Sequence, residues 1–114
     1  MALTITHNNS GQGAYRCVVE FLDAVSGTGN SDPFKCADFL GHVFHVLRNN
    51  AATGTVNIQS SIDGVTWIIV QSINIGNGSA EYCIDQRSYP YLRINYANIA
   101  AGTLTVRSAH YGGI

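Results

Sequence analysis

The chain has 114 residues and a formal net charge of −1, with 11% charged and 46% hydrophobic residues. This length suits one domain with a single core, and the hydrophobic content excludes an intrinsically disordered chain. The charge balance gives no electrostatic reason to expect nucleic acid or an anionic membrane as a partner. We therefore expect one domain over residues 1–114 that binds neither.

Lysine is the scarcest charged residue, because Lys35 is the only one in the chain. Proteins that diffuse freely usually carry more charge, which keeps them soluble. A composition this neutral favours a chain that is packed against neighbours in an assembly such as a shell or a fibre.

The first six residues, MALTIT, contain neither a basic region nor a long apolar run, so we expect no signal peptide. No apolar stretch approaches the ~20 residues of a membrane-spanning helix. The three cysteines, Cys17, Cys36 and Cys83, are odd in number and widely spaced, which disfavours a disulfide scaffold. We expect each of them to be free and buried as a small apolar residue.

Short runs of β-type composition fill the chain from end to end. The expected strands are residues 3–7, 15–22, 36–47, 53–61, 65–73, 80–84, 89–97 and 103–109. In the second run Cys17, Val19 and Phe21 share one face, which predicts that this face is buried. Asp63-Gly64 is a hairpin turn signal between two of the runs.

Two segments are harder to interpret. Residues 24–35 are rich in Ser, Gly, Asn and Asp, so we expect a long exposed loop. Residues 36–47 carry apolar groups on both faces, which predicts a strand that is buried on both sides or bent by a bulge near Gly41. A helix is the rival interpretation, but β-branched and aromatic residues favour a strand.

About eight short strands, spaced near ten residues apart with turn residues between them, predict an all-β fold. We expect a single-domain antiparallel β-sandwich that is jelly-roll-like, since eight is the strand number of a jelly roll.

The histidines are the first candidates for chemistry. A metal site needs three or four ligands that converge on one point. His42 and His45 are three residues apart, so on a strand they face opposite sides, whereas on a helix they would be neighbours. No cysteine or carboxylate lies at a helpful offset, and we expect ordinary histidines, no metal and no other cofactor.

Catalytic patterns are also missing from the sequence. No serine lies in a nucleophile elbow, and no spacing selects a pair of acids for glycoside cleavage. Asp63 is better explained by its turn. The sequence therefore predicts a protein that is not an enzyme.

Aromatic residues allow two interpretations. Trp67 is followed by a group of tyrosines at Tyr82, Tyr89, Tyr91 and Tyr96. Aromatic side chains exposed on a sandwich face can stack on sugar rings. The alternative is that they belong to the core, as expected for Trp67 and Tyr96, or to a protein interface.

Three stretches carry a resemblance to known proteins: VNIQSSIDGVTW at 56–67, YPYLRINY at 89–96 and GTLTV at 102–106. The first has the form strand, S-x-D-G-x-x-W, strand. The pattern resembles small β-sandwich virion proteins of tailed bacteriophages and, more distantly, discoidin-like and carbohydrate-binding domains. Within the phage branch the chain is similar to the capsid cement or decoration proteins.

The resemblance implies a structural role on the capsid surface of a virion, after synthesis in the host cytoplasm. Cement proteins of this kind are jelly-roll subunits, often dimers, that clamp neighbouring major capsid proteins after the shell expands. The implied partners are therefore the major capsid protein and a second copy of the chain, as a homodimer.

We expect the contacts to come from an N-terminal arm, flexible over residues 1–13, and from the loop at 24–35. The candidate interface residues are Leu3, Thr4, Ile5, His7, Asn8, Asn9, Asn30, Asp32, Phe34 and Tyr91. The rival function is a carbohydrate-binding module of a phage tail or fibre. That function predicts an exposed Trp67 or Tyr91, whereas a cement protein predicts a buried Trp67.

Overall fold

The computed structural model describes residues 2–9 and 15–112, except for the side chains of residues 7–9 and 15–16. Its elements are β1 (Thr4–Asn9), β2 (Tyr15–Asn30), β3 (Phe34–Lys35), β4 (Gly41–Ser61), β5 (Ile68–Asn74), the 3₁₀ helix η1 (Ile75–Asn77), β6 (Ala80–Cys83) and β7 (Tyr91–Tyr111). Strand pairing is antiparallel throughout the described residues. None of these residues forms a helix long and apolar enough to span a membrane.

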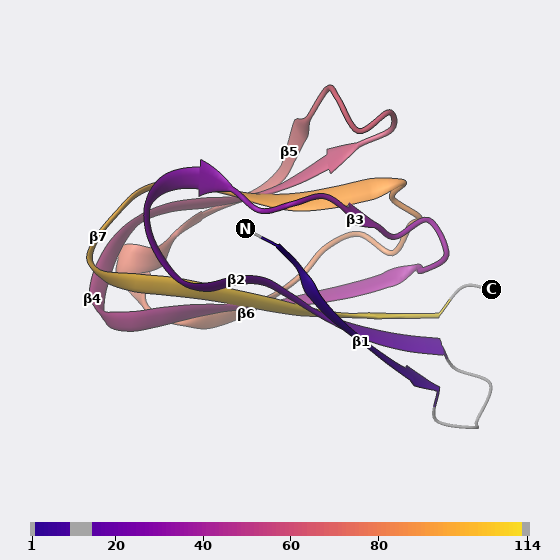
Figure 1. Cartoon of the computed structure of the whole chain (residues 1–114), viewed down its shortest axis with the longest axis horizontal. Helices are drawn as coiled ribbons and strands as arrows, with labels where there is room; N and C mark the ends of the chain where they lie inside the picture. Colours follow the sequence, from indigo (N-terminus) through magenta and orange to yellow (C-terminus); the bar gives the residue numbers. More distant parts are fainter. Residues whose placement is uncertain (1, 10–14, 113–114) are drawn as a thin grey trace.

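Two layers arise because β2, β4 and β7 are long and fold over on themselves. Strands β4 and β7 stay paired from Gly41↔Tyr111 at one end to Ser61↔Tyr91 at the other. The first part of β4 also pairs with β6, and its second part pairs with β5. Figure 1 shows the three long strands curving together at the left of the view, so that each contributes to both layers.

We call the two layers layer I and layer II. Layer I holds β1, the start of β2, the end of β7, the start of β4 and β6. Layer II holds the end of β2 with β3, the start of β7, the end of β4 and β5. If β3 is counted as a continuation of β2, because both pair with β7 in one row, each layer of the described residues has four segments apart from β1. This is the jelly-roll arrangement that the sequence predicts.

The bends lie where the long strands lose their regular register. Pairing of β4 with β7 slips between Asn50 and Thr53 and again between Thr53 and Thr55. Pairing of β2 with β7 slips repeatedly over residues 20–29. Extra residues of this kind bend a strand and increase its twist, so the shifts turn the sheet back over itself. The expected bulge near Gly41 is wrong, because Gly41 starts β4 in regular register and the bulges lie further along the strand.

The backbone at the bends requires particular residues. Asn50 and Asn98 have φ of 61° and 59°, a region that asparagine tolerates better than most residues do. Gly54 has φ of +133°, and a Cβ there would lie 2.7 Å from Cδ1 of Ile99. Only glycine fits both the angle and the space.

These bends correct several sequence expectations. The segment at 24–35 is not one long loop, because residues 24–30 belong to β2 and residues 34–35 form β3. The runs at 36–47 and 53–61 join in β4, and those at 89–97 and 103–109 join in β7. Glycine, asparagine and alanine residues that look like breaks between strands are in fact bends within them. The helix considered for 36–47 is wrong, since residues 41–47 are a strand.

The core fills the space between the layers. Cys17, Val19 and Phe21 are fully buried on one face of β2, as the alternation predicts. Equally buried residues on β4 and β7 face them, namely Phe44, Val46, Val56, Ile58, Leu92, Ile94, Leu104 and Val106. The sandwich is thus closed by alternate residues of its long strands.

The expected free arm is wrong for residues 4–9. These residues form β1 and pair with β2 from Thr4↔Glu20 to Asn9↔Tyr15. The uncharged run of alternating Thr and Ile residues explains the strand, because both types favour extended backbone. Of the expected arm over residues 1–13, residues 1 and 10–13 lie outside the described residues.

All three cysteines are free, but they differ in burial. Cys17 and Cys36 are buried, as expected, whereas Cys83 is exposed and corrects the prediction for that residue. The Cys36 thiol donates to the carbonyl O of Tyr89 at 3.0 Å. Burial, followed by the nearby Cys17, raises the pKa of Cys36 to about 12, so this thiol stays protonated.

Candidate protein-interaction surface

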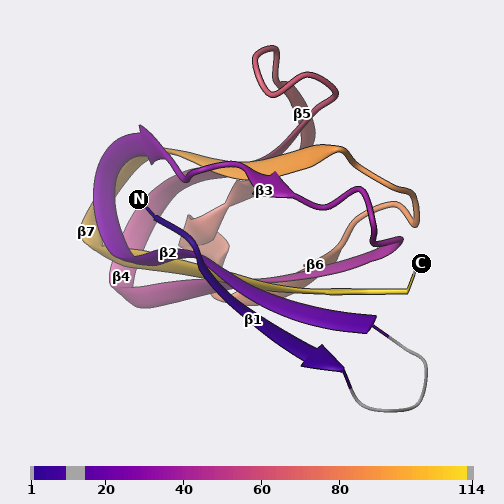
Figure 2. The ribbon, with the colours of Figure 1, turned by 45° about the vertical axis from the view of Figure 1, so that its right-hand side comes forward.

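Four large apolar side chains are exposed in the turn after β4 and in the first two residues of β5. Ile62 is 86% exposed, Val65 80%, Ile68 64% and Ile69 54%. We call residues 62–69 the apolar turn. It projects from the rest of the molecule beside β5 in both ribbon views (Figures 1 and 2). Exposed apolar residues grouped in this way mark sites of protein contact, whereas single ones are ordinary.

Hydrogen bonds hold the backbone of the apolar turn in one shape. The Asp63 carboxylate accepts from the backbone N–H groups of Val65 at 2.8 Å and Thr66 at 2.9 Å, and from the Ser61 hydroxyl at 2.9 Å. The Ser61 hydroxyl oxygen accepts in turn from the Gly64 N–H at 2.8 Å. These bonds lower the pKa of Asp63. The bond from Thr66 has the largest effect, and the bond from Val65 has the second largest.

This network explains why β5 starts later than the sequence suggests. A strand from residue 65 would need the N–H groups of Val65 and Thr66 for the sheet, but Asp63 has already bound them. The predicted Asp63-Gly64 turn is confirmed, with Gly64 at φ +79°. The turn therefore presents its apolar side chains on a defined backbone.

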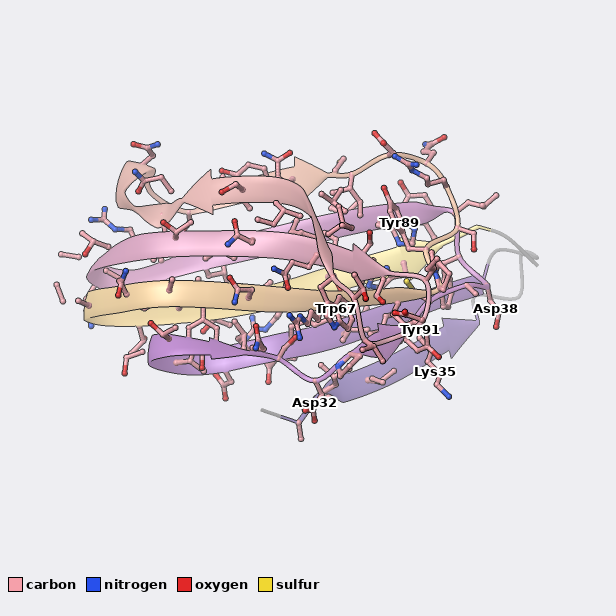
Figure 3. The ribbon with its side chains drawn as sticks, turned by 90° about the horizontal axis from the view of Figure 1, so that it is seen from above. Asp32, Lys35, Asp38, Trp67, Tyr89 and Tyr91 are labelled. Atoms are coloured by element: carbon pink, nitrogen blue, oxygen red, sulfur yellow. The ribbon has the colours of Figure 1, made fainter. Side chains whose placement is uncertain are left out.

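Trp67 fixes the apolar turn to layer II. The Arg93 guanidinium lies over the indole, 4.3 Å from the ring centroid, and its Nε donates to Oε1 of Gln59 at 2.7 Å. Trp67 is half-buried and is not part of the core cluster, so the expectation of a core tryptophan is wrong. Tyr96 does pack against the core. Figure 3 looks onto layer II and shows Trp67 and Tyr91 over this face.

A shallow hollow of about 370 Å³ lies beside the apolar turn. Its lining combines hydroxyl, carboxylate and isoleucine side chains, from Ser60, Ser61, Ile62, Asp63, Thr66 and Ile68. A hollow of this volume can accept one side chain of a partner, and it is also large enough for a small ligand.

The candidate interface residues from the sequence do not form one surface. Thr4 and Ile5 are exposed on β1 of layer I, and Leu3 is half-buried against the core. Asn30 and Asp32 are exposed near the β2–β3 edge of layer II.

The remaining interface candidates differ in burial. Tyr91 is half-buried on layer II. Phe34 is only 5% exposed and packs against Phe21 and Phe39, so its expected role at an interface is wrong. The side chains of His7, Asn8 and Asn9 lie outside the described residues, although their backbone belongs to β1.

Sequence reasoning missed the residues of the apolar turn as interface candidates. It assigned residues 65–73 to one return strand that is apolar on both faces, and it used Asp63-Gly64 only as a turn signal. An apolar residue on each side of a turn signal, as in Ile62-Asp63-Gly64-Val65, was the available indication, because turn residues are normally polar.

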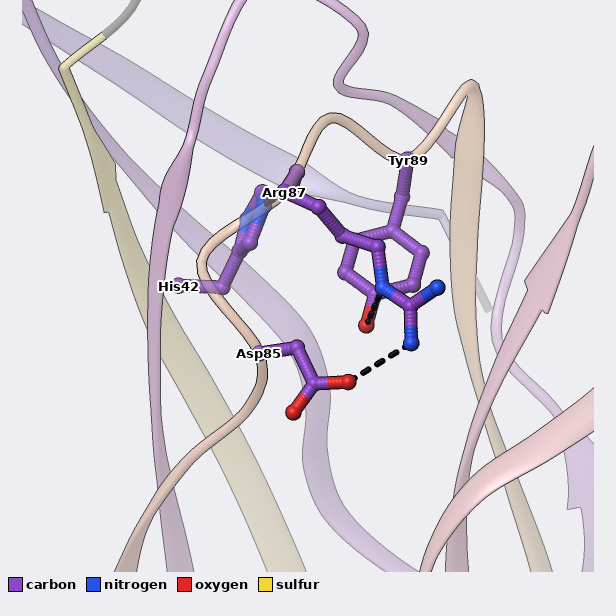
Figure 4. A network of polar contacts seen from close by, with 4 residues as sticks. All are labelled: His42, Asp85, Arg87 and Tyr89. Carbon is purple, nitrogen blue, oxygen red and sulfur yellow. Dashed lines mark hydrogen bonds and ion pairs between the residues drawn. The ribbon is translucent and has the colours of Figure 1, made fainter.

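A second arrangement of polar groups lies inside the molecule. Nδ1 of His42 and Nδ1 of His110 are 2.8 Å apart, and both side chains are buried. Nε2 of His42 lies 2.9 Å from the carbonyl O of Arg87, and Nε2 of His110 lies 2.6 Å from Oγ of Ser108. We call these four groups the histidine chain. Figure 4 shows His42 beside the 84–90 connection, where Arg87 bonds to Asp85 and Tyr89.

The partners assign every proton in the histidine chain. A carbonyl only accepts, so His42 donates from Nε2 and, when neutral, accepts at Nδ1. His110 must then donate from Nδ1 and accept at Nε2 from the Ser108 hydroxyl. Burial, followed by the nearby His42, lowers the pKa of His110 to about 3. Burial also lowers the pKa of His42, and the bond to the carbonyl O of Arg87 opposes this decrease.

The order of the groups in the histidine chain resembles that of a nucleophile, a base and an orienting group. The resemblance does not extend beyond this order. Ser108 is 4% exposed and His110 is 0% exposed, so neither side chain meets solvent or a substrate. His42 and His45 face opposite sides of β4, as the strand interpretation predicts, and His45 bonds to Glu81 at the surface. Among the described residues, no group of three or more His, Cys, Asp or Glu side chains could hold a metal ion.

Comparisons with known proteins agree with this architecture. No protein-family model matches the sequence, and no curated protein matches it significantly. Among solved structures, the SPBc2 prophage-derived protein YomS aligns over 92% of this chain and 100% of its own, with a TM-score of 0.67 and 10% identity.

Two weaker structural alignments are to an oxalate oxidase and a carbohydrate-binding module. The oxalate oxidase in complex with glycolate covers 97% of this chain and 51% of its own, at a TM-score of 0.45 and 13% identity. The family 29 carbohydrate-binding module aligns over 97% of this chain and 71% of its own, at a TM-score of 0.40 and 10% identity. The alignment with YomS shows a shared fold, and these two establish nothing further.

Proposed function

We propose that this chain is a structural virion protein that binds the outside of a phage capsid and stabilises the expanded shell by bridging major capsid proteins. The observation that carries the proposal is the apolar turn, where Ile62 and Val65 are the most exposed large apolar residues among those described. Such a turn is costly to leave in water and gains free energy when a partner covers it.

The rest of the molecule supports an assembly role. The scarcity of charge fits a chain that neighbours surround, and the fold is shared with a prophage-derived protein. Copies repeated by capsid symmetry each need only a weak contact, because the lattice holds many at once. Binding to the expanded shell alone stabilises that state by mass action.

Strand β1 supports pairing with a second copy. In the described part of the chain β1 pairs with β2 alone, which leaves its other edge open. The strand reads TITHNN and contains no lysine, acid or proline, the residues that usually block pairing at an edge. Two copies joined through β1 around a two-fold axis would present two apolar turns and so bridge two capsid subunits.

The proposal is tested with purified particles from the source phage. Quantitative mass spectrometry should find the chain in hundreds of copies, in a simple ratio to the major capsid protein. Expanded capsids stripped of the chain should take up the wild-type protein in sedimentation, and the Ile62→Ser/Val65→Ser variant should bind at least tenfold more weakly.

Leu40→Ser is the matched control, because Leu40 is 47% exposed but lies outside the apolar turn. This variant should bind capsids like the wild type. A few copies per particle would place the chain in a tail and overturn the capsid role. Equal losses for Leu40→Ser and the turn variant would remove the apolar turn as the contact.

A further inference from the structure

The apolar turn carries one charged group among its exposed apolar side chains. Asp63 lies between Ile62 and Val65, and all three residues are exposed. A partner that covers both apolar residues therefore also removes water from the Asp63 carboxylate. Among the described residues, no salt bridge includes Asp63. The carboxylate thus enters an interface without a cation from its own chain.

The carboxylate cannot turn away from a partner without breaking the bonds that hold it. Oδ1 of Asp63 accepts three hydrogen bonds, from the Ser61 hydroxyl and from the N–H groups of Val65 and Thr66. All three bonds end on the same oxygen, so Oδ2 is left for another donor. The bond from Thr66, followed by that from Val65, lowers the pKa of Asp63 and keeps the group charged.

Arg93 does not supply the missing cation. Its guanidinium lies 4.3 Å from the centroid of the Trp67 indole, and its Nε donates to Oε1 of Gln59. Arg93 therefore holds Trp67 on layer II and forms no salt bridge with Asp63. Removing water from a charge is costly unless an opposite charge takes the place of the water. A partner that covers the apolar turn has to bring that charge.

The hollow beside the apolar turn has room for a cationic side chain of the partner. Its volume is about 370 Å³, and its lining includes Asp63 and the hydroxyl groups of Ser60 and Thr66. Ile62 and Ile68 contribute apolar walls. An arginine matches both parts, because its stem is apolar and its planar guanidinium has five N–H donors for carboxylate and hydroxyl oxygens. Lysine has three donors on a more strongly hydrated ammonium, so it fits a desolvated pair less well.

We propose that the apolar turn docks on a protein surface that presents an arginine among apolar side chains, and that this arginine enters the hollow and pairs with Asp63. The guanidinium donates to Oδ2 of Asp63, and Ile62 and Val65 pack around the pair. The inference rests on the proposed capsid role and adds the chemistry of the contact. The apolar side chains favour burial, and the charge pair selects which surface fits.

Asp63→Asn removes the charge and keeps the turn. An asparagine side chain offers the same Oδ1 acceptor to Val65 and Thr66, but it places an N–H₂ group where Oδ2 was and so cannot accept from an arginine. Expanded capsids stripped of the chain should take up this variant at least tenfold more weakly than the wild type in sedimentation. Added salt should weaken uptake of the wild type more than uptake of the variant.

Asp38→Asn is the matched control. Asp38 is exposed and lies outside the apolar turn, well apart from Trp67 in Figure 3, so this variant loses the same charge elsewhere. It should be taken up by capsids like the wild type. The fluorescence spectrum of Trp67 should be the same in Asp63→Asn and the wild type, because the turn that holds this side chain persists.

Arginine footprinting tests the partner with the wild-type chain, independently of any variant. Phenylglyoxal modifies accessible arginines, and mass spectrometry locates them. An arginine of the major capsid protein should be protected when stripped capsids are loaded with the chain. Stripped capsids that are modified first should take up the chain at least tenfold more weakly. Protection of a lysine in its place, measured by acetylation, would overturn the assignment of arginine.

The outcomes separate this inference from the proposed capsid role. If capsids take up no wild-type chain, the proposed function fails and this inference fails with it. Weak uptake of Ile62→Ser/Val65→Ser together with normal uptake of Asp63→Asn and no protected arginine would overturn the charge pair alone. The apolar turn would then remain the capsid contact, and its partner surface would carry no cation opposite Asp63.

Discussion

The histidine chain and the apolar turn break the usual distribution of residues in opposite ways. The histidine chain places polar groups in the core, and each nitrogen of His42 and His110 has a partner within 2.9 Å. The apolar turn places isoleucine and valine in water, with Ile62 at 86% exposure. A buried polar group that is fully paired is explained by the fold itself, whereas an exposed apolar group is not.

The difference separates stability from function. Burying an imidazole without a partner is expensive, so a sequence keeps two only where every bond is made. Exposing an apolar side chain does not unfold a protein, but it gains nothing until a partner covers it. Changes in the histidine chain should therefore alter folding, and changes in the apolar turn should alter assembly.

The largest effect is expected from His110→Ala. The substitution leaves a cavity among Phe21, Phe34 and Phe44, and it removes the partners of Ser108 and His42. Together these losses should lower the free energy of unfolding by about 4 kcal/mol. Urea denaturation monitored by Trp67 fluorescence measures the change.

Two controls divide this loss into its parts. His110→Phe keeps the volume but not the hydrogen bonds, so it should lower stability by about 2 kcal/mol. His45→Ala removes a histidine of β4 whose bond to Glu81 is exposed, and it should cost less than about 1 kcal/mol. Equal effects for His45→Ala and His110→Ala would contradict this prediction. They would mean that burial and hydrogen bonding do not determine how much a histidine contributes to the free energy of unfolding.

A smaller, graded effect should follow from acid. The pKa values of His42 and His110 are lowered from 6.5 in the folded chain, chiefly by burial, so the unfolded chain binds protons more readily below pH 6.5. Stability is therefore full above pH 6.5 and falls as the pH drops toward about 3, the folded pKa of His110. Each histidine contributes at most about 1.4 kcal/mol per pH unit.

The histidine contribution can be isolated by its pH window. Asp63 has a pKa lowered from 3.8, so its contribution is lost only below that pH. Stability measured by urea denaturation between about pH 6.5 and pH 4.5 should thus fall in the wild type and fall less steeply in His110→Phe. A flat profile over this window would show that protonation of the histidine chain does not lower the free energy of unfolding.

Much of the fold could be predicted because alternation and turn chemistry are local signals. Val56 and Ile58 alternate with polar residues and are fully buried, and Asp63-Gly64 makes the predicted turn. The bends could not be predicted, because Asn50 and Gly54 look like the end of a strand when the partner strand is unknown. Only pairing with β7 shows that the chain continues through them.

The two sites were harder to predict than the fold. His42 and His110 are 68 residues apart, and no spacing signal joins them before β4 and β7 are paired. The apolar turn is local, but its exposure follows from the capture of two N–H groups by Asp63, which delays the start of β5. Local patterns predict which strands form, and the contacts between strands decide which side chains remain exposed.

The smallest effect on stability is expected from the apolar turn, which completes the comparison. Ile62→Ser/Val65→Ser removes two side chains that contact mainly water, so the free energy of unfolding should change by less than about 0.5 kcal/mol. Pairing of two copies through β1, measured by light scattering, should be unchanged. A stability loss near that of His110→Phe would mean that the turn belongs to the fold. The exposure of the apolar turn would then not indicate a partner. The turn and the histidine chain would both contribute to stability.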